Sequence, residues 1–283
     1  MEAQVIDQLR NFIGLGLNED VGDGDHTSLA CIPPDQSSRA KLLIKDETVL
    51  AGIEVAVEMF RYADPHSQIE HLMRDGDVAQ PGDIALYVEM NTRALLKIER
   101  LMLNTVQRMC GVASMSRRYA EAVENFDVYI LDTRKTTPLM RFLEKWAVRI
   151  GGCTNYRNGL YDRIMIKDNH ITASGSISEA ISHVHKYLED KGLDLDITLE
   201  VRSQSELDDA LASGGFQRIM LDNFTPNQMI SAVRQIDGRY EVEASGGITF
   251  DDLTKVARTG VDFISSGALT HSVMAKDLSL KIT

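Results

Sequence analysis

The sequence predicts an α/β protein in which a mixed N-terminal region precedes an incomplete α/β barrel of six or seven strands. The prediction rests on short apolar segments that recur at roughly 20–35-residue intervals along the second half. Each segment ends in polar residues or glycine, and most of the gaps between them carry a helical pattern. Strand–helix alternation of this kind indicates parallel strands joined by right-handed crossovers.

The first hundred residues contain elements of both kinds. Apolar spacing predicts helices over residues 3–17, 54–62 and 92–106, and short apolar runs predict strands over residues 40–44, 48–53 and 84–88. A polar, turn-rich segment over residues 19–28 follows the first helix. It lacks the ligand spacing of a calcium loop, so we expect it to be structural.

The second half supplies the barrel. Its strands are predicted over residues 128–131, 163–166, 196–199, 218–221, 240–243 and 261–264. Helices are predicted in the gaps, over residues 177–188, 203–212 and 226–236. Because the pattern shows six clear strands, we expect an open or seven-stranded barrel in place of a closed eightfold one.

Composition and net charge exclude several classes of protein. The chain has 283 residues, of which 43% are hydrophobic and 25% charged, a composition typical of globular proteins. We expect no membrane span and no signal peptide. The net charge of −12 argues against a general nucleic-acid binder. The three scattered cysteines, Cys31, Cys110 and Cys153, fit neither a disulfide framework nor a zinc site, so we expect a cytoplasmic protein.

Positive charge is concentrated in one part of this acidic chain. Residues 93–167 hold 14 Lys and Arg against 7 Asp and Glu, whereas the remaining residues hold 16 against 35. The imbalance favours a small, highly anionic ligand bound in a pocket. A set of solvated helix faces would produce the same imbalance and remains the alternative.

Polar or glycine residues follow all six predicted barrel strands, at the end where barrel enzymes carry their active sites. These residues are Arg134, Lys135, Lys167, Glu200, Asp222, Ser245, Gly246, Gly247, Ser266 and Gly267. Cations suit carboxylates and phosphates, and glycine turns after the last strands suit phosphate. The two acids can hold Mg²⁺, directly or through water. The set indicates a site for a phosphate ester and an anionic co-substrate, with glycoside hydrolysis by the carboxylate pair as the alternative.

Longer motifs surround these positions and are densest between residues 132 and 170. They are Asp132–Pro138, Leu143–Lys145, Ala147–Arg149, Gly151–Gly152, Asn155, Arg157, Gly159–Asp162 and Met165–His170, with Glu99–Arg100, Leu103–Asn104, Glu243–Ile248 and Gly267–Ser272 on either side. Together they closely resemble the quinolinate phosphoribosyltransferase family. The resemblance extends along essentially the whole chain.

The resemblance implies a fold and a reaction. The fold is an N-terminal α/β sandwich-like domain over residues 1–110 and a catalytic barrel over residues 111–271, with the tail 272–283 packed on the first domain. The reaction is phosphoribosyl transfer from phosphoribosyl pyrophosphate to the ring nitrogen of quinolinate. Decarboxylation accompanies it and gives nicotinate mononucleotide, pyrophosphate and CO₂ in NAD biosynthesis. The implied enzyme is a Mg²⁺-dependent cytoplasmic homodimer or hexamer with shared active sites.

The resemblance also implies roles for individual residues. The quinolinate carboxylates are assigned to Arg134, Arg157 and Lys167, with Arg100 reaching in from the neighbouring subunit. The phosphates are assigned to Lys135, His271 and the turns formed by Ser245, Gly246, Gly247, Ser266, Gly267 and Ala268, with Thr133 beside them. Mg²⁺ and the ribose hydroxyls are assigned to Glu200 and Asp222. The implied catalytic set is Lys135, Lys167, Glu200 and Asp222.

Residue 156 departs from the family pattern. The family usually has histidine before the arginine matched by Arg157, whereas this chain has Tyr156, and Cys153 and Thr154 replace usual glycines. A tyrosine hydroxyl can donate a hydrogen bond to a carboxylate but carries no positive charge at neutral pH. We therefore expect Tyr156 to contact quinolinate through one neutral hydrogen bond.

Two rival functions share some of these features. One is a relative encoded with molybdate transport, which has the same fold and some of the same motifs; the full Lys167–His170 match argues against it. The other is a catalytically dead sensor of phosphoribosyl pyrophosphate. The joint presence of Lys135, Lys167, Glu200 and Asp222 argues against a sensor, since a sensor has no need of all four.

Overall fold

A computed structural model describes residues 3–283, which divide into two compact units. The first unit comprises the chain up to Arg117 together with Thr137–Gly152 and Leu269–Thr283, and the second comprises Arg118–Thr136 and Cys153–Ala268. The domain boundary after residue 110 stays a prediction.

The first unit is built on a four-stranded antiparallel sheet with the strand order β12-β1-β5-β3. The strands are β1 (Ser37–Ile44), β3 (Gln68–His71), β5 (Ile84–Asn91) and β12 (Leu278–Ile282). In β1, Ala40, Leu42 and Ile44 are buried and alternate with more exposed residues, so one face of the sheet carries the core. The short strands β2 (Thr48–Val49) and β4 (Val78–Ala79) form a separate ladder.

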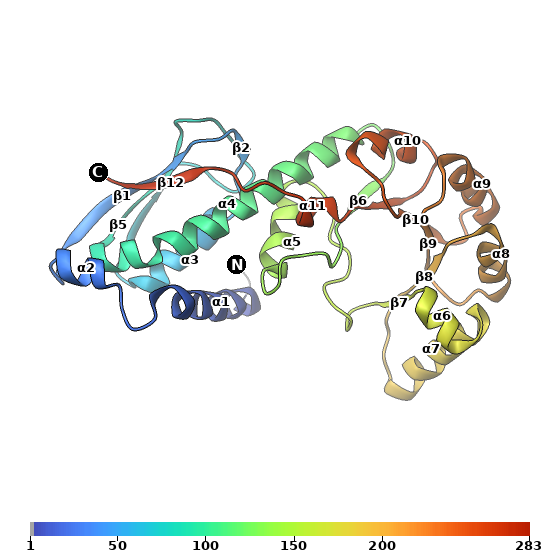
Figure 1. The fold of residues 1–283 in the computed structure, drawn as a ribbon. Helices are drawn as coiled ribbons and strands as arrows, with labels where there is room; N and C mark the ends of the chain where they lie inside the picture. Colours follow the sequence, from blue (N-terminus) through green and yellow to red (C-terminus); the bar gives the residue numbers. More distant parts are fainter. Residues whose placement is uncertain (1–2) are drawn as a thin grey trace. The chain divides into compact units, whose positions relative to one another are not determined.

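Five helices complete the elements that begin in this unit (Figure 1): α1 (Ala3–Val21), α2 (His26–Cys31), α3 (Ile53–Ala63), α4 (Thr92–Ala122) and α5 (Arg141–Ile150). The predicted strand over 48–53 is wrong beyond Val49, because Gly52 has φ 100° and is the N-cap of α3, which begins at Ile53. The predicted polar segment 19–28 contains the start of α2, where the Asp25 carboxylate accepts a hydrogen bond from the Ser28 N–H at 3.0 Å. The helix predicted over 92–106 continues to Ala122, where α4 has passed into the second unit.

The second unit contains one six-stranded parallel sheet with the order β6-β11-β10-β9-β8-β7. Its strands are β6 (Tyr129–Leu131), β7 (Ile164–Ile166), β8 (Ile197–Val201), β9 (Arg218–Asp222), β10 (Glu241–Ser245) and β11 (Phe263–Ser265). The predicted incomplete barrel is therefore confirmed, with six strands and with β6 and β7 at its edges. On the free side of β6, Thr154 forms an isolated parallel bridge with Leu131.

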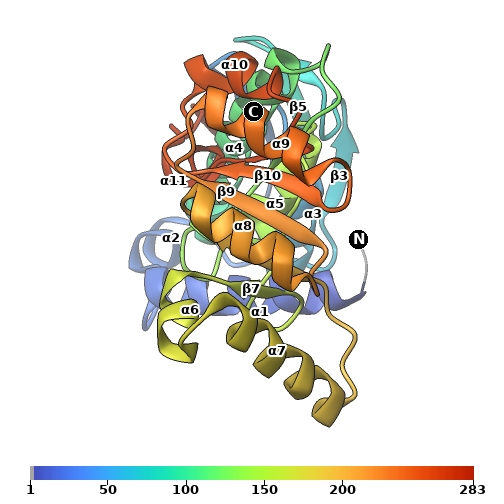
Figure 2. The same ribbon diagram turned by 90° about the vertical axis from the view of Figure 1, so that its right-hand side faces the viewer.

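Helices cover the outside of this sheet, and Figure 2 shows α7, α8 and α9 side by side in chain order. The helices are α6 (Asp168–Ser174), α7 (Ile177–Lys191), α8 (Gln204–Ser213), α9 (Pro226–Ile236) and α10 (Leu253–Ala257), with a 3₁₀ turn at Phe250–Asp252 and the short α11 (Ala268–His271) at the boundary. Among residues 3–283 we find no helix with the length and apolar character needed to cross a membrane.

The interior of the barrel is unusually polar. Strand side chains alternate between the helices and the interior, and the interior positions include Thr198 on β8, Arg218 on β9 and Glu243 on β10, each buried. The guanidinium of Arg218 pairs with the Glu243 carboxylate at 3.2 Å, and the Ser265 hydroxyl donates to the same carboxylate. Barrel interiors are ordinarily filled by branched apolar side chains, so this polar interior is a specific property of the unit that carries the candidate site.

Candidate active site

A cavity of about 510 Å³ lies beside β7, between the loops that carry the predicted cations and the helices α6 and α7. Arg134, Arg157 and Lys167, each predicted from the sequence, all line it. Two further lining residues, Arg163 and His170, were not singled out, although both lie within the motif-rich block 132–170. The structure therefore gathers cations from three separate loops into one cavity, the arrangement expected for a polyanionic ligand.

The electrostatics of Arg157 support this interpretation. Burial lowers the pKa of its guanidinium, and the nearby Arg134 guanidinium lowers it further. Arg157 makes no hydrogen bond or ion pair with any side chain or backbone group in the described part of the chain. Two neighbouring guanidiniums that repel each other are stabilised by a bound anion that satisfies both.

Lys167 is held at the start of α6. Its backbone N–H donates to Nδ1 of His170 at 2.9 Å, and its ammonium contacts the Glu200 carboxylate at 2.7 Å. The Glu200 side chain is only 9% exposed, whereas that of Lys167 is 42% exposed. Glu200 thus orients the ammonium while leaving part of it accessible, as a residue that contacts a substrate anion requires.

The loops after β9 and β10 pack tightly on each other. The carboxylate of Asp222 accepts a hydrogen bond from the Asn223 side-chain amide at 2.8 Å, and the Asn223 N–H donates to the Ser245 carbonyl at 3.0 Å. Gly246 has φ 90°, and a Cβ at this position would come within 2.5 Å of the Asn223 side chain. Only glycine fits here, and the turn follows directly on Ser245, which pairs with Asp222 across β10 and β9.

The remaining predicted residues fall in both units. In the second unit, the Ser266 N–H donates to the Leu131 carbonyl at 3.0 Å and joins the ends of β11 and β6. The Lys135 N–H donates to the Thr133 hydroxyl at 3.1 Å in the loop after β6. Gly267 and Ala268 follow, whereas Arg100, exposed on α4, and His271 on α11 belong to the first unit.

Tyr156 points into the barrel. Its hydroxyl forms a 2.6 Å hydrogen bond with the hydroxyl of Thr198, and its backbone N–H donates to the Asp132 carboxylate at 2.8 Å. Burial raises the pKa of this phenol, and the nearby Glu243 carboxylate raises it further. The hydroxyl therefore stays protonated at neutral pH.

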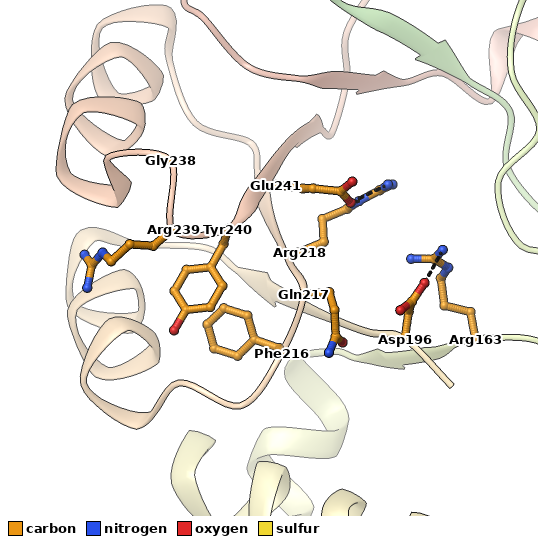
Figure 3. Close-up of a pocket in the computed structure, with 9 residues that line it drawn as sticks. All are labelled: Arg163, Asp196, Phe216, Gln217, Arg218, Gly238, Arg239, Tyr240 and Glu241. Carbon is orange, nitrogen blue, oxygen red and sulfur yellow. Dashed lines mark hydrogen bonds and ion pairs between the residues drawn. The ribbon is translucent and has the colours of Figure 1, made fainter. Parts of the chain in front are cut away.

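A second pocket, of about 500 Å³, lies at the amino-terminal ends of the same strands (Figure 3). Its cations are already paired: Arg163 with Asp196 at 2.8 Å, and Arg218 with Glu241 at 2.8 Å. Arg239 donates to the carbonyls of Ile236 and Gln235. This end of the barrel is neutralised internally, so the cavity beside β7 is the better candidate for an anionic substrate.

The acidic residues fit a metal ion that arrives with its substrate. No group of three or more His, Cys, Asp or Glu side chains that could enclose a metal occurs within residues 3–283. Glu200 and Asp222 supply two carboxylates on neighbouring strands. Mg²⁺ is ordinarily held by one or two carboxylates together with waters and substrate phosphates, so two acids suffice.

Comparisons with known proteins agree along the whole chain. Residues 25–110 match the N-terminal and residues 112–281 the C-terminal domain model of quinolinate phosphoribosyl transferase. A carboxylating nicotinate-nucleotide pyrophosphorylase of Arabidopsis thaliana chloroplasts is 42% identical over 97% of this chain and 82% of its own. A probable carboxylating nicotinate-nucleotide pyrophosphorylase of Bacillus subtilis is 40% identical over 98% of this chain and 94% of its own. The crystal structure of NadC from Streptococcus pyogenes matches with a TM-score of 0.91 at 35% identity. The match covers 100% of this chain and 99% of the NadC chain. The chain belongs to the quinolinate phosphoribosyltransferase family.

Proposed function

We propose that the protein transfers the phosphoribosyl group of phosphoribosyl pyrophosphate to the ring nitrogen of quinolinate. One carboxylate leaves as CO₂, and the products are nicotinate mononucleotide and pyrophosphate. The observation that carries the proposal is the convergence of Arg134, Arg157 and Lys167 on one cavity. Quinolinate is a dianion and the second substrate carries several more charges, so a concentrated positive pocket is required. The named activities of the relatives support the same reaction.

Each substrate has its own set of residues in this proposal. Arg134 and Arg157 bind the two adjacent quinolinate carboxylates, Lys167 contacts the same dianion, and Arg100 of a neighbouring subunit completes the pocket. The phosphates are bound by two side-chain cations and by the turns after the last strands: Lys135 with Thr133, His271, Ser245–Gly247 and Ser266–Ala268. Backbone N–H groups in glycine turns suit phosphate oxygens because no side chain blocks their approach.

The chemistry needs positioning more than covalent catalysis. The ring nitrogen attacks the anomeric carbon, an N–C bond forms, and the C–O bond to pyrophosphate breaks. Glu200 and Asp222 would hold Mg²⁺, directly or through water, and the bound ion would neutralise charge on the pyrophosphate leaving group. The carboxylates also stabilise positive charge that develops on the ribose. The alkylated ring then accepts the electron pair of the C–C bond as CO₂ leaves, and the ring carbon takes a proton from solvent.

The direct test is incubation with quinolinate, phosphoribosyl pyrophosphate and Mg²⁺, with chromatographic detection of nicotinate mononucleotide. We expect product with quinolinate and almost none with nicotinate in its place. Chelation of Mg²⁺ should stop the reaction, and excess Mg²⁺ should restore it. A protein that binds phosphoribosyl pyrophosphate but forms no product would instead be a sensor.

Loss of either active-site lysine should lower catalytic efficiency. Lys135→Ala and Lys167→Ala each remove a charge-assisted hydrogen bond worth about 1.5–3 kcal/mol, so we expect at least a roughly tenfold fall in kcat/KM. Thermal unfolding should show that the fold is intact. Lys191→Ala, at the exposed end of α7, is the matched control and should match the parent. Parent-like kinetics in either site variant would remove that lysine from the site.

We further infer that the enzyme is a cytoplasmic homodimer, or a hexamer built from dimers, with shared active sites. The exposed Arg100 on α4 and the three free cysteines support these inferences. Light scattering measures the assembly directly, and a monomer with full activity would contradict the shared site.

A further inference from the structure

We propose that Tyr156 is a positioning residue: it anchors the segment that carries Arg157 in the barrel interior and affects quinolinate binding through Arg157, without contacting quinolinate itself. The inference rests on the proposed function. It also explains why a phenol serves at a position where the family pattern has an imidazole.

The hydroxyl of Tyr156 forms a hydrogen bond inside the barrel. Its partner is Thr198 on β8, at 2.6 Å, and Thr198 is 0% exposed. A hydroxyl bonded to a fully buried partner is directed into the interior. Tyr156 is not among the residues that line the cavity with Arg134 and Arg157. The bond also spans the open side of the barrel, because Tyr156 follows the segment bridged to β6 and Thr198 lies on β8, beside β7.

The ring of Tyr156 is held by two cations. The guanidinium carbons of Arg163 and Arg218 lie 5.3 Å and 5.2 Å from the ring centroid. Both guanidiniums are fixed in turn by the carboxylates of Asp196 and Glu241, as Figure 3 shows. A neutral aromatic ring is attracted to both cations, whereas a protonated imidazole would be repelled by them.

The backbone around Tyr156 connects the two substrate loops. The Tyr156 N–H donates to the carboxylate of Asp132, which is 0% exposed and lies two residues before Arg134. The Asp132 N–H donates to the Thr154 carbonyl at 3.1 Å, and the Thr154 N–H donates to the Ile130 carbonyl at 2.8 Å. The chain on the amino-terminal side of Arg157 is therefore fastened to β6 and to the loop that carries Arg134.

Arg157 depends on this anchoring. Within residues 3–283 its guanidinium has neither a hydrogen bond nor an ion pair. The strongest charge interaction on it, from Arg134, is repulsive, and only weaker attractions from groups such as Asp162 and Glu243 oppose it. Its own side chain cannot hold it in place before an anion binds. Tyr156, the preceding residue, is fixed and therefore determines the position of the Arg157 backbone. That position determines how well the Arg157 guanidinium is oriented toward a substrate carboxylate.

The experiment separates positioning from contact by removing either end of the buried hydrogen bond. In Tyr156→Phe and Thr198→Val we expect the KM for quinolinate to rise about three- to tenfold, the effect of one neutral hydrogen bond. The double variant should show no more than the larger single effect, because both changes delete the same bond. Both kcat and the KM for phosphoribosyl pyrophosphate should stay near the parent values.

The controls test the hydroxyl itself. Thr198→Ser keeps it and should retain the parent KM, and Tyr129→Phe removes a hydroxyl from a tyrosine that is 59% exposed on β6 and should also match the parent. If Tyr156→Phe raises the KM but Thr198→Val does not, the phenol contacts quinolinate and the inference is wrong. Unchanged KM in both variants also overturns it.

Calorimetric titration with quinolinate gives the same comparison without turnover. A parent that binds quinolinate but forms no nicotinate mononucleotide contradicts the proposed function alone, because the affinities of the variants still test the positioning role. We expect the affinity for quinolinate to fall about three- to tenfold in both variants, in parallel with the KM.

Discussion

Mixing Arg100→Ala protein with Lys167→Ala protein should restore activity that neither has alone. In a shared site, Arg100 comes from one subunit and the cavity with Lys167 from the other, so each homodimer lacks a charged partner in every site and should be nearly inactive. A mixed dimer has one site with both residues and one with neither. Random reassociation of equal amounts should therefore recover about a quarter of the parent activity.

The measurement needs proof that the two variants have exchanged subunits. Differently tagged chains should be unfolded together, refolded and purified on both tags, and the activity of that fraction compared with each variant taken through the same steps alone. Arg100 is exposed on α4 and contributes no buried contact to its folding, so both variants should assemble. A doubly tagged fraction without activity would show that the site lies within one subunit.

Replacing Glu144 should cause the largest loss of stability. This carboxylate, on α5 in the first unit, is 0% exposed and accepts hydrogen bonds from Arg108 Nε at 2.9 Å and from the Thr137 hydroxyl at 2.7 Å. Breaking a buried ion pair from one side typically costs about 3–5 kcal/mol. For Glu144→Ala we expect the free energy of unfolding to fall by about 3 kcal/mol, because the Arg108 side chain is 21% exposed and partly screened.

Calorimetric unfolding should resolve this loss as a lower midpoint for the transition of the first unit. Glu19→Ala, which changes an exposed glutamate on α1 in the first unit, is the matched control and should leave the midpoint unchanged. Arg108 also donates to the carbonyls of Thr270 and Val273, which flank His271, so activity should fall with stability. Equal midpoints for the two variants would show that the buried pair contributes nothing to stability.

The barrel strands could be predicted because strands buried on both faces are apolar runs that end at polar residues, as in β8 and β9. The edge strand β3 was not predicted, since three of its four residues, Gln68, Glu70 and His71, are exposed and only Ile69 is partly buried. Helix α6 was not predicted because none of its residues is buried, so its sequence shows no periodic pattern of apolar residues.

In the candidate site, too, some residues could be predicted from the sequence and others could not. Motifs after strands identify loops, so Arg134, Arg157 and Lys167 could be named from the sequence, and the structure places them around one cavity. Partners from distant strands leave no local pattern. Thr198, which bonds the Tyr156 hydroxyl, is an ordinary strand residue in the sequence, and the Lys167–Glu200 contact likewise depends on the order of the strands in the sheet.

The pairing of β12 with β1 has a consequence for synthesis on the ribosome. In that ladder Ala40 lies opposite Ile282, so the sheet of the first unit cannot be completed until residues 278–282 have left the exit tunnel. All segments of the second unit, through Ala268, have been made by then. The barrel should therefore be able to fold while the edge of β1 in the nascent first unit is still unpaired. During this interval a chaperone would protect the unpaired edge from aggregation.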